Sequence, residues 1–296
     1  MEKQPSLAHK TTDVRSIDEL REISWRLSRK IIEITTEAGS GHPSSSLSAI
    51  DILVALYFGI MDYDPKQPKW VDRDRFILSK GHGAPGLYVV LAEAGYFDPE
   101  LLPTLRKFES PLEGHPNMRV LPGVEASSGS LGQGLSIGLG HALAAHVDGR
   151  DYRVYVMIGD GEADQGQIWE ASMAAAKFKA DNLTLLLDNN QFQQTGPVSE
   201  VMPALFPIAE KWRAFGWHVE EINGHDTEEV LSTLKKIQDI RGQPQMVICH
   251  TLKGKGLSPF EKNVVNRKHG ETLTEEEAQV ALAELDKQYG HSGGED

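Results

Sequence analysis

The amino-acid sequence predicts an α/β fold, a parallel sheet with helices on both faces. Short apolar runs that are typical of strands alternate with longer segments whose apolar residues recur at helical spacing. The runs over 152–158, 183–187 and 246–251 are mostly apolar, without regular alternation with polar residues. Such runs indicate strands that are buried on both faces, as in a parallel sheet built from βαβ units.

The first half of the chain is predicted to be mainly helical. Ser16 and Glu19 have the spacing of a capping box, and apolar residues recur at helical spacing after them, which predicts a helix over 16–38. A loop rich in glycine and proline follows at 39–43. The other predicted elements are a buried helix over 47–58, a strand over 75–79, a helix over 84–94 and a helix over 134–147 with small residues on one face.

The second half of the chain repeats strand and helix. Thr274 and Glu277 form a second capping-box pattern, which opens the last predicted helix, over 274–289. The segment 252–273 is the longest irregular stretch, and loops of that length are often functional. The other predicted elements are strands over 152–158, 183–187, 217–222 and 246–251 and helices over 165–178 and 228–240.

Charge and composition argue against several kinds of partner. Thirty Lys and Arg residues against 43 Asp and Glu give a net charge of −13, whereas nucleic acids and anionic membranes favour a basic face. The single cysteine, Cys249, lies in an apolar run and is expected to be a small buried hydrophobic residue. The N-terminus lacks the apolar core of a signal peptide, and no run reaches the roughly 18 apolar residues of a membrane span. These features favour a cytoplasmic protein with one domain over 15–290, an extension over 1–14 and a tail over 291–296.

Polar residues that suit a divalent metal follow two of the predicted strands. Asp160, between two glycines, follows the strand over 152–158, and an Asp-Asn-Asn run that ends at Asn190 follows the strand over 183–187. Ligands of parallel sheets bind at the carboxyl ends of strands, so neighbouring strands would bring these two side chains together. A carboxylate oxygen, an amide oxygen and a nearby backbone carbonyl suit Mg²⁺, which completes its octahedron with phosphate oxygens and water. The glycines beside Asp160, Gly161 among them, would let the backbone approach a diphosphate.

Simpler interpretations of these motifs fit less well. A Gly-Asp-Gly triplet is usually a plain turn, but its combination with an Asn-Asn pair after the next strand is much more specific. Nucleotide-binding motifs fit poorly. The segment Gly129–Gly134 does not have the G-x-G-x-x-G pattern and follows no clear strand, and Lys253–Gly256 lacks the Gly-Lys-Ser/Thr end of a Walker loop.

The pattern around Asp160 and Asn190 resembles the diphosphate-binding fingerprint of enzymes that depend on thiamine diphosphate (ThDP). Further segments resemble transketolase, follow one another in the order of that family, and together span roughly residues 20–275. Any one of them could arise by chance, but the ordered set indicates the family. These segments are Ser40-Gly41-His42-Pro43, Leu78–Gly83, Glu113–Pro116, Pro122–Glu125, Gly129–Gly134, Lys253–Gly256 and His269-Gly270.

The resemblance implies roles for individual residues. Histidines in loops are more often solvated or capping residues, but here the family pattern places His82 and His269 at the diphosphate and His42 and His115 at the substrate. Imidazole can donate to an oxyanion or move a proton near neutral pH. The implied catalytic residues are His42, His115 and His269. The implied cofactor contacts are His82, Gly129, Leu131, Asp160, Gly161, Asn190, Lys253 and His269. The implied metal ligands are Asp160, Asn190 and the carbonyl of Phe192, with Mg²⁺ as the metal and Ca²⁺ or Mn²⁺ as alternatives.

The resemblance also implies an activity and a partner. ThDP-dependent transketolases transfer a two-carbon ketol unit from a ketose to an aldose, both commonly phosphorylated, and the cofactor carries the reactive carbon. In the family this cofactor also needs a glutamate from a pyrimidine-binding domain, and the chain is expected to end before such a domain begins. It therefore most resembles the N-terminal section of a split transketolase. The expected partner is a C-terminal, pyrimidine-domain subunit, in an assembly with two copies of each chain.

Three positions depart from the family pattern, and two alternatives stay open. Gln165, Gln194 and Thr195 replace the usual residues, which favours a specialised transketolase over the pentose-phosphate enzyme. One alternative is an E1 α-type subunit of a 2-oxo acid dehydrogenase, which shares the fingerprint but not the histidine loops. The other is a non-catalytic scaffold with the ThDP fold, against which the intact Asp160 and Asn190 argue. A phosphohydrolase would need a nucleophile motif that the sequence does not display.

Overall fold

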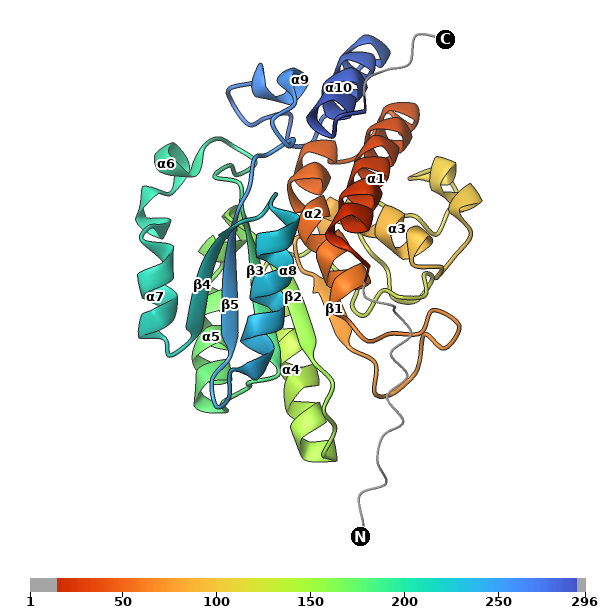
Figure 1. Cartoon of the computed structure of the whole chain (residues 1–296). Coiled ribbons are helices and arrows are strands. Elements are labelled where there is room, and N and C mark those ends of the chain that lie inside the picture. Colours follow the sequence, from red (N-terminus) through yellow and green to blue (C-terminus); the bar gives the residue numbers. More distant parts are fainter. Residues whose placement is uncertain (1–14, 292–296) are drawn as a thin grey trace.

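The computed structural model describes residues 15–291, which form a five-stranded parallel sheet between two layers of helices (Figure 1). This arrangement confirms the predicted α/β class. The predicted extension over 1–14 and the predicted tail after His291 lie outside the described residues. In spatial order the strands are β1 (Arg75–Leu78), β2 (Val154–Gly159), β3 (Leu183–Asn189), β5 (Gln245–His250) and β4 (His218–Asn223).

Helices cover each face of the sheet over a separate apolar core. Tyr155 and Met157 of β2 join the core that holds α1, α2, α3, α8 and α10, whereas Val156 and Ile158 join the core on the other face, with α4, α5 and α7. This alternation follows from the period of a strand, in which successive side chains point to opposite faces. The helices are α1 (Ile17–Ala38), α2 (Pro43–Gly59), α3 (Ala84–Glu93), α4 (Gln133–Asp148), α5 (Gly166–Lys177), α6 (Val198–Val201), α7 (Ile208–Ala214), α8 (Thr227–Lys236), α9 (Ser258–Glu261) and α10 (Glu275–Gln288).

Both predicted capping boxes are present and open their helices. The Ser16 hydroxyl accepts the amide of Glu19 while the Glu19 carboxylate accepts the amide of Ser16, and Thr274 and Glu277 do the same at α10. The start of α2 differs from the prediction of 47. The helix begins at Pro43, because proline fits the first helical position, where a missing N–H costs nothing. The short helix α7 was not predicted.

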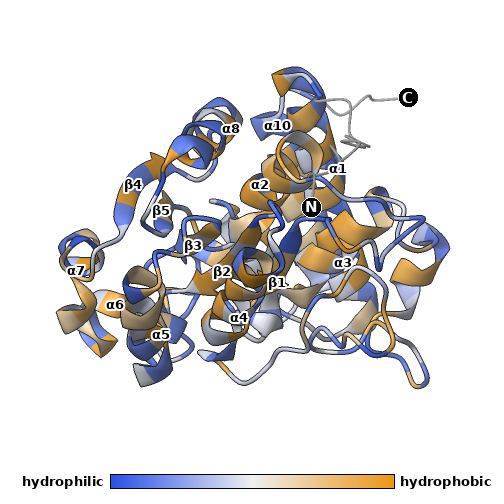
Figure 2. Cartoon of the chain, turned by 90° about the horizontal axis from the view of Figure 1, so that it is seen from below, coloured by the Kyte–Doolittle hydropathy of each residue, from blue (hydrophilic) through white to orange (hydrophobic). Residues whose placement is uncertain are grey.

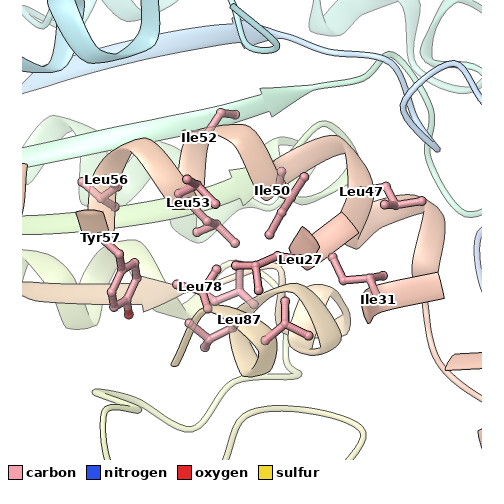
Figure 3. Packing of buried hydrophobic residues seen from close by; sticks show 14 of the residues in the cluster. Leu27, Ile31, Leu47, Ile50, Ile52, Leu53, Leu56, Tyr57, Leu78 and Leu87 are labelled. Carbon is pink, nitrogen blue, oxygen red and sulfur yellow. The ribbon is translucent and has the colours of Figure 1, made fainter. Parts of the chain in front are cut away.

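Helix α2 is the centre of the larger core. All of its residues are buried, and the hydrophobic colour is strong in α2 and α3 in Figure 2. Figure 3 shows Leu27 of α1, Leu78 of β1 and Leu87 of α3 around Ile50 and Leu53 of α2. A helix that is buried along its whole length is enclosed by the rest of the fold, and α2 therefore provides a rigid support behind the loop that precedes it.

The glycine face of α4 packs closely on its neighbours, as the sequence predicted. A Cβ at Gly134 would lie 2.4 Å from the side chain of Ser79, and one at Gly138 would lie 2.4 Å from Val156. None of the helices within residues 15–291 combines the length and the apolar character that a membrane crossing requires.

The strand register decides where the site residues lie. β2 and β3 are parallel neighbours, and Gly159 pairs with Asp188. Asp160 and Asn190 therefore leave adjacent strands at the same edge of the sheet. This confirms the expectation that the two strands are neighbours.

Candidate functional site

A pocket of about 320 Å³ lies at the carboxyl ends of β2 and β3. It brings together nearly all the residues that the sequence singled out, although they come from loops far apart in the chain. Lys253 lies outside the lining set, but its ammonium is 2.7 Å from Nδ1 of His269, which lines the pocket. The predicted residues in the lining are His42, His82, His115, Gly129, Leu131, Asp160, Gly161, Asn190, Phe192 and His269.

Asp160 has the features expected of a metal ligand. Its side chain is 2% exposed, and Oδ2 accepts the amide of Gln191 at 2.7 Å. Its Oδ1 is buried and has no hydrogen-bond partner among residues 15–291. Burial and the nearby charge of Asp188 raise the pKa of Asp160 to about 8. A buried carboxylate oxygen without a partner is costly, and a divalent cation bound to it would remove that cost.

Asn190 is held with a defined orientation beside Asp160. Its amide nitrogen donates to Oγ of Ser48 and to Oδ2 of Asp188, both at 3.3 Å, and its Oδ1 accepts the amide of Phe192 at 3.1 Å. The described residues contain no cluster of three or more His, Cys, Asp or Glu that could hold a metal. The candidate set instead has one carboxylate, one amide and one backbone carbonyl, which suits a hard cation that also binds phosphate and water.

Three histidines converge on the pocket. The ring centroids of His42, His82 and His269 lie between 4.9 and 5.3 Å from one another. Burial, with Arg106 and other nearby positive groups, lowers the pKa of His42 to about 4. Burial and the charge of Lys253 lower the pKa of His269 to about 3, and burial and Lys80 put that of His82 well below its usual value. All three imidazoles are therefore neutral at pH 7, each with one N–H donor and one acceptor nitrogen.

The cationic and unpartnered groups of the pocket suit an anionic ligand. Lys253 is 3% exposed, and burial, with the charge of Lys80, lowers its pKa to about 7. Nδ1 of His42 and Oγ of Ser128 are buried without a hydrogen-bond partner among the described residues. Buried polar atoms without partners indicate that a ligand completes the pocket. A diphosphate would accept from the ammonium of Lys253.

The substrate side is more open. His115 is exposed, and burial and Arg106 lower its pKa below the usual value. It packs against Gly129, where a Cβ would lie 3.2 Å from the imidazole. Gly129 has φ +141°, which disfavours other residues. Gln194 and Thr195 line the pocket, whereas Gln165 is exposed outside it.

Sequence reasoning missed three buried polar residues that support the site. Lys80 and Asp188, 1% and 0% exposed, form an ion pair, and Asp188 also accepts from Ser48 at 2.6 Å. Glu162 accepts the hydroxyl of Ser79 and the amide of Gly132, and burial raises its pKa to about 7. Lys80 and Asp188 lie inside motif segments but were assigned no role there, and Glu162 lies two residues after Asp160, so proximity in sequence was the available signal. Their mutual contacts could not be read from spacing.

Comparisons with known proteins agree with this geometry. The family described as transketolase, thiamine diphosphate binding domain, matches residues 25–293. The chain is 43% identical to the 6-deoxy-6-sulfo-D-fructose transketolase subunit SqwG of Clostridium sp. (strain MSTE9), covering 97% of this chain and 98% of that protein. It is 42% identical to an apulose-4-phosphate transketolase subunit of Phocaeicola vulgatus, covering 87% of this chain and 90% of that protein.

Longer transketolases match over part of their length. The human transketolase is 38% identical over 92% of this chain, which spans 43% of the human protein. The transketolase structure from Leishmania mexicana superposes with a TM-score of 0.83 at 31% identity, covering 94% of this chain and 42% of that one. The chain thus spans less than half of these proteins but almost all of the separate subunits. It belongs to the transketolase family and corresponds to the thiamine diphosphate binding domain.

Proposed function

We propose that this chain is the ThDP- and Mg²⁺-binding subunit of a two-chain transketolase, with residues 15–290 as its one domain. The enzyme would transfer a two-carbon ketol unit from a ketose or ketose phosphate to an aldose or aldose phosphate. The observation that carries this proposal is the buried Oδ1 of Asp160 beside Asn190, which has no hydrogen-bond partner within residues 15–291, in a pocket lined by neutral histidines. Subunit-sized relatives that are named transketolase subunits support it.

Different residues of the pocket would bind the metal, the phosphates of ThDP and the rings of ThDP. Asp160, Asn190 and the carbonyl of Phe192 would hold Mg²⁺, or Ca²⁺ or Mn²⁺ in its place, against the diphosphate. When bound, ThDP supplies a nucleophilic carbon and an electron sink. His82, His269 and Lys253 would donate hydrogen bonds to the phosphate oxygens, and the backbone at Gly161 would let them approach. Gly129 and Leu131 would contact the rings of the cofactor.

His42 and His115 would interact with the sugar substrate. A neutral imidazole can donate its N–H to a substrate hydroxyl and accept a proton at its other nitrogen. Because the pKa values of both are lowered, they would remain available as acceptors at pH 7. Gln194 and Thr195, at the pocket wall, favour a specialised sugar as substrate.

The partner would be a C-terminal subunit with the pyrimidine-binding domain, in an assembly with two copies of each chain. The test is to assay ketol transfer from ketose phosphates with this chain alone and after the companion subunit is added. We expect activity to appear only with the companion. Full activity of the chain alone would overturn the two-chain proposal.

Calorimetry with ThDP and Mg²⁺ tests the metal site separately. We expect Asp160→Ala to abolish binding in the presence of the companion, because the substitution removes the one anionic ligand of the proposed metal. Unchanged affinity would mean that the metal lies elsewhere. An absence of ThDP binding by the unmodified complex would favour the scaffold alternative.

A further inference from the structure

A buried carboxylate that does not line the pocket joins five parts of the fold. Asp51 of α2 is 2% exposed and lies outside the set of described residues that line the pocket. Its Oδ1 accepts the hydroxyl of Ser24, the ammonium of Lys255 at 2.7 Å and the hydroxyl of Tyr289 at 3.1 Å. Its Oδ2 lies 2.7 Å from Nδ1 of His225. These partners come from α1, the segment after β5, the C-terminal cap of α10 and the segment after β4.

Two of these partners hold the segment 252–256, which we call the cofactor loop. Nε2 of His225 accepts the amide of Leu252 at 2.9 Å, so Nδ1 carries the ring proton and donates it to Asp51. Lys255, at the other end of the loop, donates to Asp51 and to the hydroxyl of Tyr289 at 2.6 Å. Asp51 thereby anchors both ends of the loop.

The cofactor loop has a backbone conformation that needs such anchors. Gly254, Lys255 and Gly256 are consecutive residues in the left-handed region, with φ of 76°, 59° and 73°. Glycine adopts this region freely, but at Lys255 it is disfavoured and persists where surrounding contacts determine it. The side chain of Lys255 is 6% exposed, and its ammonium makes two hydrogen bonds inside the protein.

The opposite side of the loop contributes to the pocket. Lys253 directs its ammonium to Nδ1 of His269, 2.7 Å away, while Lys255, two residues later, directs its own to Asp51. The amide of Gly254, between them, donates to the carbonyl of Ser44 at 2.9 Å. A shift of the Lys255 end would therefore move the ammonium of Lys253 relative to His269, which lines the pocket.

We propose that Asp51 is a positioning residue, which holds Lys253 in place for the diphosphate by anchoring the cofactor loop through Lys255 and His225. The proposal rests on the proposed function of the pocket. Burial alone would raise the pKa of Asp51, but the charge of Lys255 and the bond from His225 lower it far below the usual range. Burial alone would lower the pKa of Lys255, but the charge of Asp51 and the other partners raise it above its usual value. The pair is therefore charged at every pH at which the enzyme would work.

Asp51→Asn tests the proposal, because it removes the charge and keeps the size. In the complex with the companion subunit, we expect the Kd of ThDP at saturating Mg²⁺ to rise by about tenfold or more, the loss expected when one hydrogen bond between charged groups is weakened. We expect kcat at saturating ThDP to stay within about threefold, since Asp51 touches no reacting group. Hydrogen exchange of the Leu252 and Gly254 amides should accelerate without any cofactor present.

Two further variants separate positioning from general stability. Asp286→Asn is the matched control, because Asp286 also joins α10 to α1, through Arg29 at 2.6 Å and Trp25 at 2.8 Å, without contact to the cofactor loop. It should lower the unfolding temperature and leave the Kd of ThDP unchanged. In Asp51→Asn/Lys255→Met both buried charges are gone, so the unfolding temperature should recover while the Kd stays high.

The outcomes are distinct. The positioning role would be overturned if Asp51→Asn bound ThDP with the wild-type Kd and its Leu252 and Gly254 amides exchanged at the wild-type rate. It would also be overturned if Asp51→Asn/Lys255→Met recovered the wild-type Kd of ThDP along with its unfolding temperature. If the unmodified complex does not bind ThDP, the proposed function fails. The exchange rates of Leu252 and Gly254 would still decide whether Asp51 anchors the loop.

Discussion

At the scale of single residues, the histidines of the pocket differ in their surroundings. His42 and His269 are partly buried among positive groups, whereas His115 is exposed at the rim and packs on Gly129. The exposed imidazole of His115 is the one that a sugar could reach from solvent, whereas the pKa values of the two more buried imidazoles are shifted to about 4 and about 3. These differences lead to two predictions.

The first prediction concerns His115→Ala. We expect kcat/KM for the sugar to fall by about 100-fold, the lower end of the range for a side chain that moves a proton, while the Kd of ThDP stays the same. Steady-state kinetics and calorimetry on the complex provide the measurement. His146→Ala, at a surface histidine 3.5 Å from Asp181, is the control and should change neither quantity. A parallel loss of ThDP affinity in His115→Ala would contradict the assignment.

The second prediction concerns pH and the stability of the cofactor-free chain. The pKa of His42 is lowered to about 4 from the usual 6.5. Below pH 6.5 the unfolded chain therefore takes up a proton that the folded chain does not bind until about pH 4. The contribution of His42 to the free energy of unfolding is therefore complete above pH 6.5 and is lost as the pH falls. At pH 5 the free energy of unfolding is lower by about 2 kcal/mol.

Urea unfolding at pH 7 and pH 5 measures this loss. The His42→Asn variant should lose less stability between the two pH values than the unmodified chain, because it lacks the titrating group. Equal losses in both proteins would show that His42 titrates normally.

At the scale of elements, α4 offers a matched pair of glycines. A Cβ at Gly138 would lie 2.4 Å from Val156, whereas one at Gly140 has nothing within 4 Å in the described chain. Gly138→Ala should lower the free energy of unfolding by about 1–3 kcal/mol, because it overpacks the contact with β2. Gly140→Ala should raise it by up to about 1 kcal/mol, through the better helix propensity of alanine. Chemical denaturation of the two variants gives the comparison, and equal effects would contradict the close packing of α4 on the sheet.

Element boundaries followed from sequence wherever a local signal was strong. The capping boxes at Ser16 and Thr274 depend on residues three apart, so the first and last helices began where predicted. Helix α7 has seven residues, and its Trp212 is buried in the core. The ring of Trp212 packs against Trp217 and against residues that are distant in the chain. A segment this short carries too little periodicity to be recognised.

At the scale of the whole molecule, ligand binding and folding are coupled. The pocket is assembled from loops that lie over much of the chain, from His42 to His269, so a bound ligand holds these parts together. With the companion present, ThDP and Mg²⁺ at about 100 times the Kd should raise the free energy of unfolding by about 2.7 kcal/mol. Differential scanning calorimetry should show a higher melting temperature. Removal of Mg²⁺ by EDTA should reverse the rise, and a rise that survives EDTA would exclude a role for the metal.

The sequence by itself determined the fold class, the order of the strands and of the longer helices along the chain, and the meeting of Asp160 with Asn190, all of which depend on local pattern. The other pocket residues were predicted from the resemblance of the ordered motifs to transketolase. Apolar runs mark buried strands, and a polar group directly after such a strand, as at Asp160 or Asn190, lies at the ligand-binding edge of a parallel sheet.

Tertiary structure alone decided which of the buried charged and polar residues contact one another. The ion pair of Lys80 and Asp188 and the anchoring of Lys255 by Asp51 join residues 108 and 204 positions apart. No periodicity relates residues at such separations, and their pairing depends on which buried charges the packed elements bring face to face. The same packing leaves Oδ1 of Asp160 buried and without a partner in the described chain, which no reading of the sequence could reveal.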